Sequence, residues 1–348
     1  MATIKDVALR AGVSVTTVSH VVNDTRHVSA KVRERVEEAI RELGYVPSAV
    51  ARSLKSNTTR TVGMLIPNSS NPYFAEIVRV VEDRCFGAGY TLVLCNTDDE
   101  PRRQSVYLQV LSERRIDGLI VVSTGDDASL ATLLRGLRMP VVLVDREIDD
   151  PACDLVESAH MHGGLLATRH LVSLGHTRIA CIGGPAGLAP SAQRIEGWRM
   201  ALAEAGLSPA AGAGELLWHG GFTSQGGYEA MHAIARTSSP PSAVFVCNDL
   251  MAIGALRAAH ESGLRVPDGL SVVGFDDIEL SSFTSPPLTT VAQPKARIGA
   301  LAVDMLLERI DGRRHEPRKV MLQPELHVRG STARHAGFSE PAARRSAA

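Results

Sequence analysis

The first 22 residues, MATIKDVALRAGVSVTTVSHVV, hold two short amphipathic segments separated by a glycine. Apolar residues recur at helical spacing in the first segment: Ile4, Val7 and Ala8. Thr3 precedes Asp6 by three residues, the spacing of a capping box at a helix start. Gly12 can form the turn, and Ser14 can cap a second helix over 15–22. Two helices joined in this way form a helix-turn-helix motif, whose second helix enters the major groove of DNA; an ordinary helical hairpin is the alternative.

A third helix and a charge asymmetry favour DNA binding. Ser29 can cap a helix over 30–43 that ends before Gly44. Its apolar face would close a three-helix headpiece over residues 1–46: Val32, Val36, Ala39, Ile40 and Leu43. Residues 1–60 contain ten Lys or Arg against six Asp or Glu, whereas the whole chain contains 37 against 38. A basic end on an acidic remainder is expected when only that end meets phosphates.

Residues 47–60 form a linker with its own pattern. Pro47 is tolerated in a first helical turn, so residues 47–54 can form two turns of helix. Such a segment is too short to be stable alone, because helix nucleation is costly. We therefore expect a hinge helix that folds only when it packs against DNA and a second copy of the chain.

From residue 61 onward, short β-rich runs alternate with segments of helix length. The runs are TVGMLI, YTLVLCN, DGLIVV, PVVLVD, RIACIGG, SAVFVCND and LSVVGFDD. This alternation predicts an α/β fold with two doubly wound parallel-sheet lobes in residues 61–332. The expected division is about 61–159 with 292–320 for lobe 1, and about 160–291 with 321–332 for lobe 2. Residues 333–348, rich in Ala, Arg and Ser, are expected to form a frayed tail.

Polar and aromatic residues follow these runs, where doubly wound sheets bind ligands. They are Asn71, Tyr73, Phe74, Asp145, Arg146, Arg194, Phe222, Asn248, Asp276 and Gln293. Aromatic faces with carboxylates, a guanidinium and amides around them suit a small polyhydroxylated ligand, so we expect an effector site in a cleft between the lobes. Ordinary roles are the alternatives. Phe74 and Phe222 could be core residues, Asp145 and Arg146 a surface ion pair, and Asn248 and Asp276 caps.

The runs KDVALRAGVSVTTVSHVVN and LGYVPSAVARSLKSNTTRTVGMLIP resemble the LacI/GalR family of bacterial transcriptional repressors, over about residues 2–332. The resemblance implies lobes of the periplasmic-binding-protein type and a homodimer that reads a pseudo-palindromic, double-stranded operator. It implies DNA contacts at Thr3, Ser14, Val15, Thr16, Thr17, Ser19, His20, Asn23, Ser29, Tyr45, Ala51, Leu54 and Lys55. Base readout would fall on Val15, Thr16 and His20. Leu54 would be a wedge between base steps in the minor groove.

The lobes also resemble the periplasmic ribose-binding protein, which implies a sugar effector. The matching sugar contacts are Phe74, Asp145, Arg146, Arg194, Phe222, Asn248, Asp276 and Gln293. Purine-responsive members of the family carry an arginine and a threonine where this chain has Leu188 and Pro190. We therefore expect ribose or a related pentose that weakens operator binding. A purine- or nucleoside-responsive repressor is the alternative.

Other classes of function find less support. No nucleophile, metal-ligand or dinucleotide frame is present, so we expect no catalytic residue, no metal and no cofactor, and the four histidines at 160, 162, 170 and 176 lack a metal-binding spacing. An enzyme would have to use Asp145 and Asp276 as acid and base. A transport-type sugar-binding protein would need an export signal. The five cysteines read as reduced, buried thiols, and no apolar stretch reaches 18 residues, so we expect a cytoplasmic protein without a membrane partner.

Overall fold

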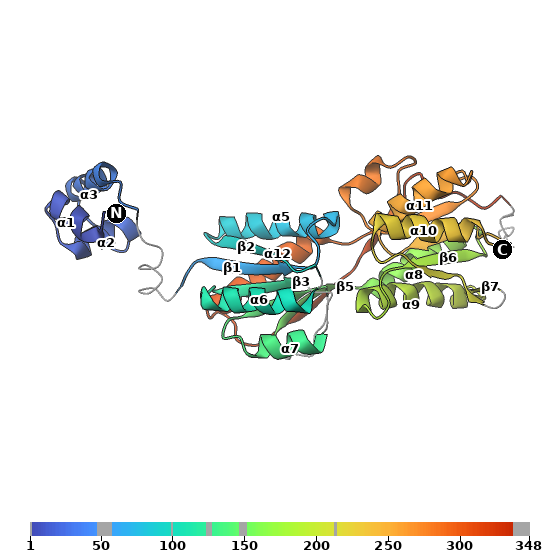
Figure 1. Ribbon diagram of the computed structural model, residues 1–348, viewed down its shortest axis with the longest axis horizontal. Coiled ribbons are helices and arrows are strands. Elements are labelled where there is room, and N and C mark those ends of the chain that lie inside the picture. Colours follow the sequence, from blue (N-terminus) through green and yellow to red (C-terminus); the bar gives the residue numbers. More distant parts are fainter. Residues whose placement is uncertain are drawn as a thin grey trace, which may run out of the picture. The chain divides into compact units, whose positions relative to one another are not determined.

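The computed structural model describes residues 2–46, 58–98, 100–122, 127–145, 152–211 and 214–336. The chain divides into two compact units, Met1–Arg60 and Thr61–Ala348 (Figure 1). Four positions expected to contact DNA or effector lie outside the described residues: Ala51, Leu54, Lys55 and Arg146. The hinge helix expected over 47–54 lies outside them too, so these expectations stay predictions.

The headpiece is a three-helix module of α1 (Ile4–Ala11), α2 (Val15–Asn23) and α3 (Ala30–Leu43). The capping box at Thr3 and Asp6 is present, and Ser14 Oγ accepts a hydrogen bond from the Thr17 amide at 3.1 Å. Gly12 has a φ of 61° and lies against Arg35, whose guanidinium donates to the Ala11 and Gly12 carbonyls. A Cβ at Gly12 would lie 2.9 Å from Arg35 Nη2, so the turn requires glycine for two reasons.

Seven buried apolar residues form the core of the headpiece: Val7, Ala8, Ala11, Val18, Val21, Val36 and Ala39. Two expectations for α3 were wrong. Leu43 is 36% exposed, because it lies in the last turn, where the chain leaves the helix at Gly44. Ser29 precedes α3 but its side chain makes no capping hydrogen bond, so the first turn of α3 has no side-chain cap from that residue.

Lobe 1 is a six-stranded parallel sheet in the order β13-β5-β4-β3-β1-β2. Its strands are β1 (Thr61–Ile66), β2 (Thr91–Asn96), β3 (Gly118–Val122), β4 (Val141–Val144), β5 (Asp154–Ser158) and β13 (Lys319–Leu322). Helices α5 (Pro72–Gly87) and α12 (Lys295–Ile310) pack on one face. Helices α6 (Pro101–Glu113) and α7 (Asp127–Arg135) cover the other (Figure 1). The inner strands β1, β3, β4 and β5 are buried on both faces, which explains their continuous apolar runs, whereas the edge strand β2 is partly exposed.

Lobe 2 repeats this plan, with the order β14-β12-β11-β10-β6-β9 and only β14 antiparallel. Its strands are β6 (Ile179–Gly183), β9 (Leu217–His219), β10 (Ala243–Val246), β11 (Ser271–Asp276), β12 (Thr289–Ala292) and β14 (Glu325–His327). Helices α8 (His160–Ser173) and α9 (Ala189–Glu204) lie on one side, and α10 (Ser224–Ala235) and α11 (Asp249–Glu261) on the other (Figure 1). A short two-stranded ribbon, β7 (Ala210–Ala211) with β8 (Gly214–Glu215), and a 3₁₀ turn, η1 (Glu279–Phe283), complete the elements.

The chain passes between the lobes three times: after β5, after β12 and after β13. All of β13 pairs in the lobe 1 sheet, up to Leu322. The C-terminal segment is held for longer than expected. The Ala333 amide donates to Ser271 Oγ at 3.0 Å and the His335 amide donates to the Leu174 carbonyl at 2.9 Å, which binds these residues to lobe 2.

Candidate functional site

The start of α2 presents a polar surface suited to the major groove. Val15 is 41% exposed and Thr16 is exposed, while Ser19 and His20 are half-buried. His20 Nδ1 lies 2.8 Å from Thr25 Oγ1, which fixes the orientation of the imidazole. A preoriented side chain loses less entropy on binding, which would suit the base readout expected of this helix.

Other headpiece residues expected at DNA already have local partners. These partners are the helix caps for Thr3, Ser14 and Thr17, the Ser19 carbonyl for Asn23, and the headpiece core for the half-buried Tyr45. If Thr3, Ser14 and Thr17 contact phosphate, their hydroxyl groups are already held in place by the first turns of α1 and α2. The exposed Ser29 makes no such capping bond.

A cleft of about 490 Å³ lies between the two lobes. Eight of the ten residues expected at the effector site line it: Asn71, Tyr73, Phe74, Asp145, Arg194, Phe222, Asn248 and Asp276. Gln293 does not line the cleft but donates through Nε2 to Asp276 Oδ1 at 2.8 Å. The carboxyl ends of both sheets thus supply side chains to one cavity, as the strand-end rule predicts.

Three of these side chains stand on left-handed backbone, which is uncommon for residues other than glycine. The φ angles are 65° at Asp145, 60° at Phe222 and 108° at Asp276. Backbone strain of this kind costs about 1–3 kcal/mol per residue and gathers at functional sites. The ring of Phe222 lies against Gly184, where a Cβ would approach the ring to 2.4 Å. Gly184, in the glycine-rich run after β6, therefore makes room for an aromatic face.

Arg194 is the central donor of the cleft. It is 4% exposed, its Nη1 donates to the Cys247 carbonyl at 2.6 Å, and the same nitrogen lies 3.4 Å from Asp276 Oδ1. Its guanidinium carbon lies 3.9 Å from the centre of the Phe275 ring, which is a stabilising cation–π contact. The guanidinium is therefore held in one orientation as part of the cleft wall.

The two carboxylates of the cleft differ in acidity. Burial raises the pKa of Asp276 to about 6, although Arg194 and Gln293 oppose the shift. Burial would also raise the pKa of Asp145, but His160, Arg194 and the Tyr73 hydroxyl outweigh it, so that this pKa is lowered. The same burial, together with Asp145, raises the pKa of Tyr73 well above its usual range. Near neutral pH the cleft therefore holds two acceptor carboxylates and a phenol that stays a donor.

The local contacts of the cleft residues show which of them also have ordinary structural roles, such as helix capping. Asn248 caps α11, since its Oδ1 accepts from the Met251 amide at 2.9 Å, and Asn71 caps α5 in the same way. Asn248 Nδ2 also donates to the Phe222 carbonyl, at 3.4 Å. Asp145 is 9% exposed, so a surface ion pair is the wrong description of it. Asp276 ends β11 and bonds to Gln293.

Sequence reasoning missed two polar residues next to the cleft. His160 begins α8 directly after β5, and its Nε2 lies 2.9 Å from Asp145 Oδ1. The strand-end rule would have included it, since only Ala159 separates it from Ser158, the last residue of β5. Lys295 donates through Nζ to the Asp276 carbonyl at 2.7 Å. No sequence signal marks that contact, which depends on how β12 leads into α12.

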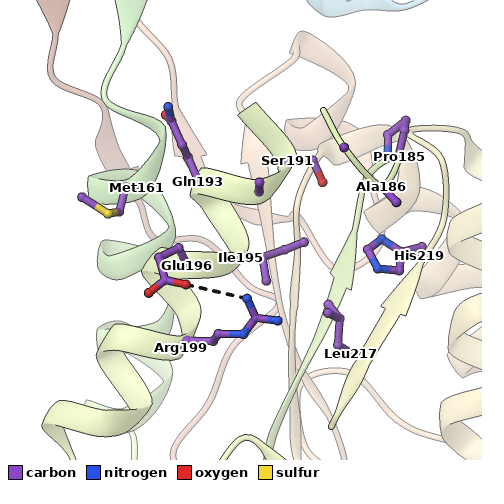
Figure 2. Close-up of a pocket in the computed structure, with 12 residues that line it drawn as sticks. Met161, Pro185, Ala186, Ser191, Gln193, Ile195, Glu196, Arg199, Leu217 and His219 are labelled. Atoms are coloured by element: carbon purple, nitrogen blue, oxygen red, sulfur yellow. Dashed lines mark ion pairs between the residues drawn. The ribbon is translucent and has the colours of Figure 1, made fainter. Parts of the chain in front are cut away.

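A second hollow of about 480 Å³ lies beside α9 in lobe 2. Figure 2 shows Pro185 and Ala186 at one end and the ion pair between Glu196 and Arg199, 3.7 Å apart, at the other. The loop 185–187 lines both this hollow and the cleft. That part of the cleft wall is therefore backed by open space rather than by packed side chains.

Within the ranges that the structure describes, no group of three or more His, Cys, Asp or Glu is arranged to hold a metal ion. None of the described helices is both long and apolar enough to cross a membrane. The five cysteines are buried and form no disulfide.

Comparison with known proteins decides the family. Residues 3–48 match the model for bacterial regulatory proteins of the lacI family, and residues 168–332 match a periplasmic binding protein-like domain. The chain is 47% identical to the HTH-type transcriptional repressor PurR of Aliivibrio fischeri, covering 95% of this chain and 98% of that protein. This chain belongs to the lacI family. It is also 46% identical to the ribose operon repressor of Escherichia coli, covering 95% of this chain and 100% of that protein.

Solved structures of lacI-family proteins show the same architecture. The lac repressor dimer bound to operator and the anti-inducer ONPF matches with a TM-score of 0.86 at 33% identity, covering 95% of this chain and 99% of that chain. A LacI family transcriptional regulator from Enterococcus faecium with bound ribose matches with a TM-score of 0.71 at 30% identity, covering 79% of this chain and 99% of that chain. The expected fold class, a helix-turn-helix headpiece with two periplasmic-binding-protein lobes, is confirmed.

Proposed function

We propose that this protein is a transcriptional repressor that binds a pseudo-palindromic operator as a homodimer and that releases the operator when a ribose-type sugar occupies the cleft. Residues 1–46 would read the operator, the hinge at 47–60 would join the two copies over DNA, and residues 61–332 would bind the sugar and the second copy. The lac repressor structure, a dimer on its operator, supports the DNA and dimer parts of the proposal. Such a protein acts where the chromosome is, in the cytoplasm.

The composition of the cleft is the observation that carries the sugar assignment. Phe74 and Phe222 offer apolar faces, Arg194 offers a fixed donor, and Asp145 and Asp276 offer buried acceptors. A sugar hydroxyl both donates and accepts, so a small polyol can pair with every one of these polar groups. A ligand without those hydroxyls would leave the cleft-facing sides of these polar groups without hydrogen-bond partners and would be rejected. The ribose-bound relative supports the same assignment.

A purine or nucleoside is the second candidate, because a relative of similar identity is a PurR protein. The cleft residues argue against it. Leu188 and Pro190 line the cleft, and neither side chain can hydrogen-bond to the ring nitrogens or carbonyl groups of a base. The sign of the response separates the two candidates, because a corepressor tightens operator binding whereas an inducer weakens it.

Lobe movement is the proposed link between sugar and DNA. The cleft is lined from both lobes, so a bound sugar favours one arrangement of the lobes. That arrangement would separate the two hinges of the dimer, which then no longer pair over the minor groove. Coupling between two sites is typically worth about 1–3 kcal/mol, or about 5- to 150-fold in affinity, and it acts in both directions.

We assign no catalytic role to the cleft. Asp145 and Asp276 are bound to Tyr73, Gln293 and Arg194, and they serve as acceptors in the proposed site. D-ribose incubated with the protein should therefore be recovered unchanged by chromatography, and any turnover would contradict this part of the proposal.

Fluorescence anisotropy tests the whole proposal. Operator duplexes are first selected from a random library with the full-length protein, and the chosen duplex is then titrated with protein with and without D-ribose. We expect D-ribose to weaken operator binding by about tenfold or more. Guanine and hypoxanthine should leave it unchanged. Tighter binding with a purine, or no response to D-ribose, would contradict the sugar assignment, and a failure to select any sequence would contradict repression itself.

The pH dependence of sugar binding follows from Asp276. Because burial raises its pKa to about 6, the carboxyl is protonated below that pH and must lose its proton to act as a charged acceptor. We expect D-ribose affinity to be constant above about pH 7 and to fall by up to about tenfold per pH unit below pH 6. Asp145 stays ionised over this range because its pKa is lowered. Calorimetry from pH 5 to pH 8 measures the profile. Asp276→Asn should bind weakly at every pH, without the break near pH 6.

A further inference from the structure

His160 stands at the first passage between the lobes. It is the first residue of α8, two positions after β5 leaves the lobe 1 sheet, and it is 2% exposed. Its ring lies beside Phe275, with the two ring centres 6.2 Å apart. It does not line the cleft, so a bound ligand would not touch it directly. A buried polar side chain needs hydrogen-bond partners. Both polar neighbours of His160 are residues of the proposed effector site.

The imidazole joins one lobe 1 residue to one lobe 2 residue. Its Nε2 lies 2.9 Å from Asp145 Oδ1, at the end of β4 in lobe 1. Its Nδ1 lies 3.4 Å from Arg194 Nε and 3.3 Å from Nη2, on α9 in lobe 2. Both atoms are buried, and among the described residues neither His160 Nε2 nor Asp145 Oδ1 meets the geometry of a hydrogen bond, so what joins them is a close polar contact. Each of these two buried atoms therefore depends on the other.

The partners determine the tautomer. Arg194 can only donate, so Nδ1 must accept and carry no proton. Asp145 can accept at Oδ1, so the proton belongs on Nε2. The neutral Nε2–H tautomer is thus the form of His160 that satisfies both neighbours.

The second passage between the lobes bears a similar residue. Gln293 follows β12, donates to Asp276 through Nε2, and accepts from the Tyr73 hydroxyl at 3.2 Å. The same hydroxyl lies 3.0 Å from Asp145 Oδ2, so its single hydrogen is shared between the two acceptors. The contacts therefore close a ring through both passages, made of Arg194, His160, Asp145, Tyr73, Gln293 and Asp276. A group that binds Asp145, Arg194 or Asp276 therefore contacts side chains that are bonded to residues at two of the passages between the lobes.

We propose that His160 is a positioning residue, which aligns Asp145 and Arg194 for the sugar and transmits occupancy of the cleft to the angle between the lobes. The inference rests on the proposed function, since it concerns the same site. It adds one residue and one structural connection. A sugar that contacts Asp145 and Arg194 shifts the His160 side chain, and His160 in turn shifts the start of α8. Without the imidazole, Asp145 Oδ1 and one edge of Arg194 lose their buried partner, and both side chains gain alternative orientations.

Three variants separate the two contacts. His160→Gln keeps a donor at about the reach of Nε2, so it can still serve Asp145. His160→Asn places its amide near the position of Nδ1, so it can serve Arg194 alone. His160→Ala removes both contacts. His162→Ala, at an exposed position on the same helix, is the matched control.

Calorimetry with D-ribose, operator anisotropy and thermal unfolding are measured on each full-length variant. For His160→Ala we expect D-ribose affinity about 10- to 100-fold lower, with a smaller effect of sugar on operator binding. His160→Gln and His160→Asn should each recover part of the affinity, and His162→Ala should match the parent. If His160→Ala binds sugar and releases DNA like the parent, or if sugar and sugar-free operator affinities fall together with the melting temperature, the inference is overturned.

A readout without sugar separates this inference from the sugar assignment. Long-range ¹H–¹⁵N correlation spectra of the full chain near pH 7.5 should show His160 as the Nε2–H tautomer, with a signal that disappears in His160→Gln. A proton on Nδ1 would overturn the bridge to Arg194. If the tautomer is as expected but the parent protein gives no heat with D-ribose, the assignment of ribose fails while the bridge through His160 holds.

Discussion

Replacing Arg194 with leucine is expected to lower the affinity for D-ribose by about a hundredfold or more. The guanidinium is almost fully buried and faces Asp276 at 3.4 Å, so the change leaves a buried carboxylate without its cation. Truncating one partner of a buried, hydrogen-bonded charge pair costs about 2–5 kcal/mol in binding, and every 1.4 kcal/mol is about tenfold. The variant also loses the donor that would hold a sugar hydroxyl. Titration calorimetry with the full-length protein measures the loss.

Arg199→Leu is the matched control for this change. Arg199 lies on the same helix, α9, but its side chain is 40% exposed and pairs with Glu196 at 3.7 Å. Its loss should leave sugar binding within about twofold, because exposed ion pairs contribute little. Thermal unfolding shows whether Arg194→Leu still folds, and the operator titration shows whether the headpiece still works. An Arg194→Leu protein that folds and binds D-ribose normally would place the sugar elsewhere.

Replacing Val18 with aspartate is expected to abolish specific operator binding, with a loss of more than about a hundredfold. Val18 is fully buried at the centre of the headpiece core, which has only seven buried apolar residues. An unpaired charge cannot be buried there without a cost of several kcal/mol, and so small a unit has little stability in reserve. The headpiece should therefore unfold. D-ribose binding should persist, because Thr61–Ala348 is a separate compact unit with its own cores.

Leu9→Asp tests whether burial is the cause. Leu9 is 85% exposed on α1, so the same charge should leave the headpiece folded, as shown by dispersed amide signals. Val18→Asp should lose those signals for residues 2–46. If Val18→Asp keeps both its amide dispersion and its operator affinity, the three-helix core is not what supports DNA binding.

The headpiece could be predicted almost completely from the sequence, because its signals are local. A capping pair, a turn glycine and apolar residues at helical spacing specify each helix within a few residues. The errors lie where local rules are weak. Leu43 was expected in the core but is exposed. Nothing in the sequence shows that the last turn of α3 lies beyond the other two helices of the core.

The cleft could be predicted in composition but not in its contacts. Because parallel strands direct their carboxyl ends to one edge, residues that follow the strands had to gather, and eight of the ten line one cavity. The rule does not say what each side chain bonds to. Asn248 and Asn71 use their oxygens to cap helices, and the left-handed backbone at Asp276 was not foreseen.

The two kinds of module, their order and the class of residues at the cleft follow from the sequence, since helix caps and strand ends depend on neighbouring residues. Which atoms meet depends on the tertiary structure. His160 and Gln293 come from separate passages between the lobes, and their bonds to Asp145, Arg194 and Asp276 exist only once both sheets have formed. The physical reason is that a hydrogen bond requires two atoms at a defined distance and angle. Residues so far apart in the sequence reach that geometry only through the packing of both lobes.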